Sequence, residues 1–311
     1  MARSTIIDCD PGQDDAVMLL LACASPELDI IGVTTVAGNV PLELTQRNAR
    51  LILELAGRDD IPVYAGCGLP LAREPIATEA VHGTTGIDGC PIHEPALPLA
   101  EGHAVDFIVE TCRAAADGAI TLVPTGPLTN IASALTKAPD ITAHIEQIVL
   151  MGGTSAFGSR VSPVAEFNIL SDPDAAQIVF ACGVSIVAFG FDVTQHVIRT
   201  PARLDAIRAI GTPAGDAVAG MLSHDSKYDD DKSGAPGRAL HDPCPVAWLI
   251  RPELFRGGRV NVEVETVSEL TLGMTVVDRW GITGRPTNTL WMRDVDVDGL
   301  FELLVERLAR L

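Results

Sequence analysis

Four aspartates lie within eight residues near the N-terminus, at Asp8, Asp10, Asp14 and Asp15. The apolar stretch before them predicts a short buried strand, and Pro11-Gly12 predicts the turn that ends it. One or two of these acids could cap the following helix, because a carboxylate accepts hydrogen bonds from the free amides of a first turn. Capping does not explain several facing carboxylates, since like charges repel unless a proton or cation neutralises them. We therefore favour an all-oxygen site for a divalent cation or for sugar hydroxyls.

Further polar residues stand where later predicted strands end. Asn39, Thr125 and Met151-Gly152-Gly153 each follow or close such a strand. Taken singly, each could be an ordinary turn residue or helix cap. The carboxyl ends of parallel strands share one edge of a sheet, so these residues are expected to converge with the aspartates on one cleft.

Two later segments add candidates to this edge. Glu166 and Asn168 are two residues apart, so in an extended segment they would lie on one side and suit neighbouring hydroxyls of a sugar. The alternative is a solvated strand edge. Asp242 precedes an apolar helix, where it is either an N-cap or a metal ligand beside the proton-donating His241.

The order of the predicted elements sets the fold class. Strands alternate with helices along most of the chain, which predicts a single-domain α/β fold spanning 1–311, with a mostly parallel open sheet and helices on both faces. The active site is expected at the carboxyl ends of the strands. Strands are predicted at 5–7, 29–36, 62–64, 120–123, 145–151, 184–189, 260–267, 270–277 and 287–292, and helices at 16–23, 41–57, 104–116, 128–136, 173–181, 201–222 (broken near 211–213), 246–250 and 297–311; a long loop over 66–102 and a polar flap over 224–238 complete the pattern.

Composition limits the classes of partner and compartment. The 311 residues carry a net charge of -19, which argues against nucleic acid or an anionic membrane surface as a partner. The seven scattered cysteines form no CxxC pair, so we expect reduced thiols. The longest early apolar run, 16–24, is too short to span a bilayer, and no signal peptide precedes it, so a cytoplasmic protein is expected. The dinucleotide, P-loop and serine-hydrolase motifs are absent from the sequence.

Taken together, the motifs resemble those of the inosine–uridine preferring nucleoside hydrolases. Each piece alone is weak, but they occur in order over most of the chain. They are the runs at 8–16, 36–40, 82–83, 125–130, 151–153, 165–169 and 240–243.

This resemblance implies hydrolysis of the N-glycosidic bond of a ribonucleoside to ribose and free base, with a bound calcium ion (Ca2+). By the same likeness the metal would be held by Asp10, Asp15, the Thr125 carbonyl and Asp242. Asp10 would take a proton from the attacking water, and His241 is the candidate acid for the leaving base, with His82 second. The residues implied near the substrate are Asp14, Asn39, His82, Met151, Glu166 and Asn168.

Specificity and assembly are less defined. His224 and Tyr228 are four residues apart and would share a helical face beside the base if the flap starts as a helix. Arg160 stands where the family usually has the asparagine that binds the ribose 5′-hydroxyl, so that contact, or a 5′-substituted substrate, stays open. The resemblance implies a homodimer or homotetramer. The alternatives are a calcium-dependent ribose- or nucleoside-binding protein without turnover and a magnesium-dependent phosphohydrolase.

Overall fold

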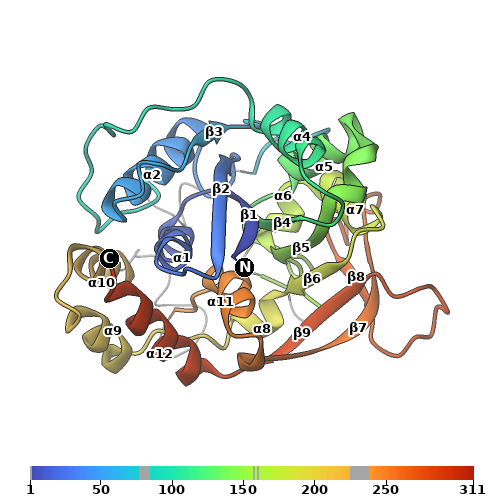
Figure 1. Ribbon diagram of the computed structural model, residues 1–311. Helices are drawn as coiled ribbons and strands as arrows, with labels where there is room; N and C mark the ends of the chain where they lie inside the picture. The colour runs from blue at the N-terminus through green and yellow to red at the C-terminus, as the bar shows by residue number, and fades with distance from the viewer. Residues whose placement is uncertain (1, 77–84, 157, 160, 225–237) are drawn as a thin grey trace.

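A nine-stranded sheet forms the centre of the computed structural model, which describes residues 2–76, 85–156, 158–159, 161–224 and 238–311 (Figure 1). The strand order is β3-β2-β1-β4-β5-β6-β9-β7-β8. Neighbours are parallel from β3 to β9, whereas β7 runs antiparallel to both β9 and β8. The bounds are β1 Arg3–Cys9, β2 Leu28–Thr35, β3 Val63–Ala65, β4 Ile120–Pro124, β5 Ile145–Met151, β6 Ile186–Phe189, β7 Phe255–Val264, β8 Thr275–Asp278 and β9 Thr289–Val295.

Helices cover both faces of this sheet, so the predicted α/β class with a mostly parallel open sheet is confirmed. In β1, Ile7 packs into one apolar cluster and Ile6 into the other, because successive strand residues face opposite sides. The helices are α1 Gln13–Cys23, α2 Leu42–Leu55, α4 Ala104–Ala114, α5 Thr129–Lys137, α6 Phe167–Ser171, α7 Pro173–Phe180, α8 Phe191–Thr194, α9 Pro201–Arg208, α10 Pro213–Ser223, α11 Pro243–Ile250 and α12 Val297–Leu308, with 3-10 turns at Pro139–His144 and Pro252–Leu254.

Helix α1 is enclosed on all sides, which explains its continuous apolar sequence. Residues 16–21 are fully buried, and α1 packs against α2, α10, α11 and α12. Its contact with α11 matters most for the site, because it brings the first turn of α1, which begins at Gln13, beside Asp242.

Three sequence predictions of local structure were wrong. The strand expected at 260–267 begins earlier and ends at Val264, and most of the strand expected at 270–277 is a turn around Gly273 (φ +74°), where a side chain would collide with Leu170. Residues 167–171 form the short helix α6, so Glu166 and Asn168 are not two positions of an extended strand. The break expected in 201–222 is confirmed, because α9 ends before Gly211 (φ +69°) and α10 begins after it.

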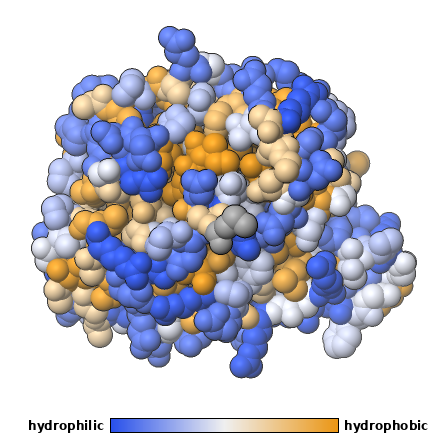
Figure 2. All heavy atoms as spheres, in the orientation of Figure 1, coloured by the Kyte–Doolittle hydropathy of each residue, from blue (hydrophilic) through white to orange (hydrophobic). Residues whose placement is uncertain are grey.

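The surface and the thiols agree with the composition. The face shown in Figure 2 is largely hydrophilic, with apolar side chains gathered near its centre. All seven cysteines are free, as expected. Within the described part of the chain, helices long and apolar enough to cross a membrane are absent.

Candidate active site

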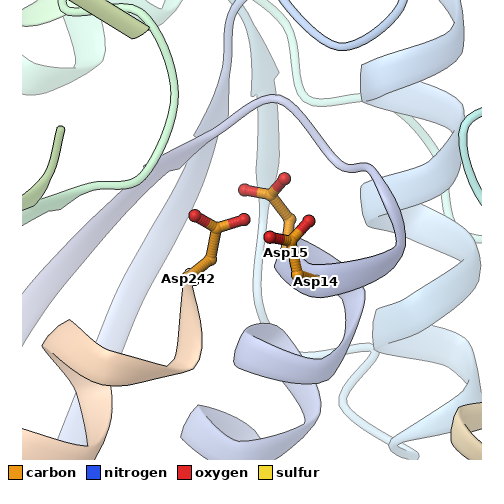
Figure 3. Close-up of side chains that lie close together, drawn as sticks. All are labelled: Asp14, Asp15 and Asp242. Atoms are coloured by element: carbon orange, nitrogen blue, oxygen red, sulfur yellow. The ribbon is translucent and has the colours of Figure 1, made fainter. Parts of the chain in front are cut away.

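Three carboxylates from two distant parts of the chain meet at the carboxyl end of β1 (Figure 3). Asp14 and Asp15 lie in the first turn of α1, directly after the turn that follows β1. Asp242 immediately precedes α11. One oxygen from each of the three lies within 4.8 Å of the others, so a single ion could contact all of them.

Asp242 is not used as a helix cap. It occupies the N-cap position of α11, yet its side chain makes no capping hydrogen bond, and Pro243 removes one of the amides that a cap would satisfy. Its carboxyl group instead lies within hydrogen-bonding reach of both Asp14 and Asp15. The structure therefore favours a ligand-binding role for Asp242 over capping.

Asp15 combines a structural role with its place in the cluster. Its Oδ2 accepts hydrogen bonds from the Gly12 amide (3.2 Å) and from Asn39 Nδ2 (3.1 Å), and its Oδ1 accepts one from Thr125 Oγ1 (2.8 Å). These contacts link the first turn of α1 to the ends of β2 and β4. Capping thus accounts for part of the role of one aspartate, as the sequence suggested.

Asp10 lies next to the three-carboxylate cluster and is fully buried. Its Oδ2 accepts the Asn39 amide hydrogen at 2.7 Å, whereas its Oδ1 has no hydrogen-bond partner among the described residues. Gly38 and Gly126 enclose it closely, because a Cβ at either position would lie 2.1 Å or 2.5 Å from an Asp10 oxygen. The chain thus holds this carboxylate rigidly and leaves one of its oxygens for a ligand.

The electrostatics of these carboxylates disfavour full ionisation of the group. Burial, and then the neighbouring carboxylates, raise the pKa of Asp15 from 3.8 to about 7. The pKa values of Asp10 and Asp242 are raised well above the usual range for the same two reasons. At neutral pH these acids either share protons or need a cation, because mutual repulsion in a buried site is costly.

A second group of predicted residues lies beside this cluster. Asn168 Nδ2 donates to the carbonyl oxygen of Thr125 (2.8 Å) and to that of Met151 (3.2 Å), so three of the predicted site residues are in direct contact. A carbonyl oxygen has two lone pairs, so the Thr125 oxygen could still coordinate an ion.

Glu166 is a buried N-cap of α6 and is tied to the same group. Its oxygens accept the amide hydrogens of Asn168 and Gly153, both at 2.9 Å. Burial raises its pKa to about 7 despite these hydrogen bonds. The residue is therefore held in place by the backbone that surrounds the expected ribose site.

Of the remaining predicted residues, two histidines lie within the described part of the chain. His241 is half-buried, and its Nδ1 lies 2.7 Å from Thr194 Oγ1. His224 is exposed at the end of α10. The predictions for His82, Tyr228 and Arg160 lie outside the described residues.

One buried hydrogen-bond network behind the site was not predicted from the sequence. Asp8 Oδ1 accepts hydrogen bonds from Thr34 Oγ1 (2.6 Å) and Asn130 Nδ2 (2.8 Å), and Asn130 also bonds to Thr35 O (3.0 Å) and the Cys67 amide (2.8 Å). Burial raises the pKa of Asp8 to about 7. The signal was a carboxylate on a strand otherwise predicted to be buried, together with an asparagine within the 125–130 run.

The donor set fits a hard divalent cation. The contributing groups are carboxylates, and the nearby Thr125 carbonyl offers oxygen too, which favours calcium or magnesium over zinc. The Asp10 oxygen without a partner is an independent sign that the chain alone does not complete the site.

The fold and site define an α/β protein with an acidic, oxygen-rich site at the carboxyl ends of its strands, and comparison with known proteins gives its family. Residues 5–302 match the family model described as inosine-uridine preferring nucleoside hydrolase. The chain belongs to this family, and it is a ribonucleoside hydrolase.

Relatives and solved structures agree over nearly the full length. The chain is 48% identical over 310 residues to the pyrimidine-specific ribonucleoside hydrolase RihA of Photobacterium profundum, covering 99% of both chains. It is similar to the purine-preferring ribonucleoside hydrolase from Gardnerella vaginalis (TM-score 0.91, 32% identity, 99% and 98% covered) and to the plant nucleoside hydrolase PpNRh1 (TM-score 0.90, 31% identity, 99% of both covered). All three are named as hydrolases, which favours an enzyme over a binding protein without turnover.

Proposed function

We propose that the protein is a calcium-dependent hydrolase of pyrimidine ribonucleosides, releasing ribose and the free base. The observation that carries the proposal is the convergence of Asp14, Asp15 and Asp242, with the unpartnered Asp10 oxygen beside them. The preference for pyrimidines rests on the relatives of 45–48% identity that are named pyrimidine-specific, whereas the purine-preferring structure is only 32% identical.

We propose Asp10, Asp15, Asp242 and the Thr125 carbonyl as the ligands of calcium. Calcium accepts six to eight oxygen ligands, so this set leaves positions for the two ribose hydroxyls and a water. When bound, the ion would orient the diol and lower the pKa of that water. With Asp14 beside three ionised aspartates, the site would be strongly negative, and a bound calcium ion would offset this charge.

The proton transfers are assigned to two side chains of this chain. Asp10 takes a proton from the attacking water as the new C–O bond forms at the anomeric carbon. His241 donates a proton to the base as the C–N bond breaks, so the bonding electrons leave with the base and the charges balance. The carboxylates around the ring also stabilise the positive charge that develops on the ribosyl centre.

Binding of the ribose is assigned to the polar side chains around the cluster. Asp14, Asn39, Glu166 and Asn168 would contact the hydroxyls, and Met151 would pack against the sugar. Hydrogen bonds of Asn39, Glu166 and Asn168 support this assignment, because they fix these side chains before the substrate arrives and lower the entropic cost of binding.

A panel of ribonucleosides tests this function. Purified protein with 1 mol of calcium or more per chain would be assayed for reducing sugar released from uridine, cytidine, inosine and adenosine. We expect the two pyrimidine nucleosides to have the highest kcat/KM. Turnover of purine nucleosides alone would contradict the specificity, and no turnover of any of the four would contradict the activity.

We propose a cytoplasmic homodimer or homotetramer whose chain forms one domain over 1–311. Four large apolar side chains on the segments that flank β8 support assembly, because each is more than 80% exposed: Val267, Leu270, Trp280 and Ile282. Light scattering on the purified protein would measure the mass, and a monomer at micromolar concentration would contradict the proposal.

A further inference from the structure

Two residues of the short helix α8 hold the imidazole of His241. Thr194 Oγ1 lies 2.7 Å from Nδ1, and the Phe191 ring stacks on the imidazole with 5.4 Å between centroids and 21° between planes. Thr194 is fully buried, so its hydroxyl is fixed by the protein rather than by solvent. Contacts on one edge and one face leave the imidazole little freedom to rotate.

Helix α8 is itself anchored by Asp192. The Asp192 carboxylate accepts hydrogen bonds from the Ser155 amide (3.0 Å), the Ser155 hydroxyl (2.5 Å) and the Trp291 indole (3.2 Å). At Gly190, before the helix, a Cβ would lie 2.4 Å from Trp291, so only glycine allows this close approach. A four-residue helix has little stability of its own, so these ties to the β5 loop and to β9 determine where Thr194 and Phe191 stand.

A hydroxyl is a chemically suitable partner for a histidine that donates a proton. When Nδ1 is protonated it donates to Thr194 Oγ1, both before and after the Nε2 proton is given to the leaving base. Since a hydroxyl carries no charge, it fixes the ring without the strong retention of the proton that a carboxylate partner would cause. The Nδ1 contact therefore assigns proton transfer to Nε2.

We propose that Thr194 is a positioning residue for the transfer of a proton from His241 Nε2 to the leaving base, and that Phe191 sets the plane of the ring. The inference rests on the proposed function, because it requires hydrolysis with His241 as the acid. It adds a second layer to that site, which reaches from Trp291 through Asp192 and α8 to the imidazole.

The test compares two leaving groups. Thr194→Val removes the hydroxyl and keeps the shape, and Thr194→Ser keeps the hydroxyl. For uridine, whose base needs a proton to leave well, we expect Thr194→Val to lower kcat roughly 10- to 100-fold with KM within about twofold, and Thr194→Ser to stay within about threefold of wild type. For p-nitrophenyl β-D-ribofuranoside, whose phenolate leaves without a proton, we expect Thr194→Val to retain the wild-type rate.

A matched control removes another buried threonine hydroxyl. Thr121 in β4 is fully buried and bonds to Glu146, away from the cluster, so Thr121→Val should keep wild-type kcat on both substrates. In a His241→Ala background, Thr194→Val should cause no further loss on uridine, because the residue it positions is gone.

Two results would overturn the inference. One is an unchanged kcat of Thr194→Val on uridine; the other is an equal loss on both substrates, which would indicate a general structural defect, checked by circular dichroism. If the wild-type protein hydrolyses p-nitrophenyl riboside and uridine and Thr194→Val gives either result, the inference fails but the proposed function stands. Wild-type protein inactive on every ribonucleoside would contradict the proposed function and this inference with it.

Discussion

Two sets of carboxylates in this protein have opposite surroundings. Glu166 and Asp172 each place both oxygens against hydrogen-bond donors of the chain: Asp172 accepts from the amides of Ala175 and Leu71 and from the Thr129 hydroxyl, at 2.8–3.0 Å. By contrast, Asp14, Asp15 and Asp242 bring their oxygens together, and Asp10 keeps one oxygen without a partner. Hydrogen bonds of the chain satisfy the first set, whereas in the second set carboxylates face one another, an arrangement that a bound cation or shared protons would offset.

The difference shows what burial of an acid means at each place. A buried charge costs several kcal/mol unless hydrogen bonds or an opposite charge offset it. Around Asp172 the offset is built from backbone amides, so the acid stabilises the fold. Around Asp242 the neighbouring groups are other carboxylates, so we expect a bound cation or shared protons to supply the offset.

Chelation is expected to have the largest effect on this comparison. After treatment with EGTA, the rate of uridine hydrolysis should fall to the background rate, because the ion that would orient water and ribose has been removed. Added calcium should restore the rate. Full activity in chelator would show that the facing carboxylates do not need an ion.

Asp10→Asn is expected to have the next largest effect. Loss of the general base should lower kcat on uridine about 1000-fold at saturating calcium, within the range that general base catalysis supplies. The same exchange at Asp172 is the matched control, because it also replaces a buried carboxylate. A drop of less than tenfold for Asp10→Asn would remove Asp10 as the base.

Asp172→Asn should act on stability instead of on the ion. An amide nitrogen placed against the Leu71 amide or the Thr129 hydroxyl loses an accepted hydrogen bond and leaves a buried donor unsatisfied, which costs about 1–3 kcal/mol of unfolding free energy. Urea denaturation in saturating calcium measures this. The calcium affinity should be unchanged, and a weakened affinity would place Asp172 within the metal site.

The smallest effect is a pH dependence of the metal-free protein. The pKa of Asp15 is raised from 3.8 to about 7, and those of Asp10 and Asp242 are raised too. Protonation of these groups therefore stabilises the folded state relative to the unfolded state. This contribution is fully present below about pH 4 and is lost as pH rises through about 7. In chelator, Tm should therefore fall by about 2–6 °C between pH 5.5 and 8. Calcium should raise Tm more at pH 8 than at pH 5.5, and a Tm gain independent of pH would contradict the coupling.

The proximity of candidate residues could be predicted from the sequence where they are close together along the chain. Asp10, Asp14 and Asp15 share one strand–turn–helix unit, so their proximity follows from the spacing alone. Asn39 and Thr125 could be placed because parallel strands end at a common edge.

Contacts that depend on helix packing were not predictable in the same way. Asp242 meets Asp15 only because α11 packs on α1, and its capping position gave no reason to exclude a cap. Glu166 was expected on an extended segment, but its carboxylate caps a five-residue helix that local periodicity is too short to reveal. Thr194 carries no motif, and its contact with His241 follows only from the position of α8.

Calorimetric titration of calcium into chelator-treated protein at pH 7.5 tests the central claim most directly. We predict one ion per chain for wild type and for Asp172→Asn with equal affinity, and an affinity at least about 100-fold weaker for Asp15→Asn and for Asp242→Asn. Wild-type protein that binds no calcium, or an Asp242→Asn variant that binds it as tightly as wild type, would contradict the assignment of these carboxylates as a metal site.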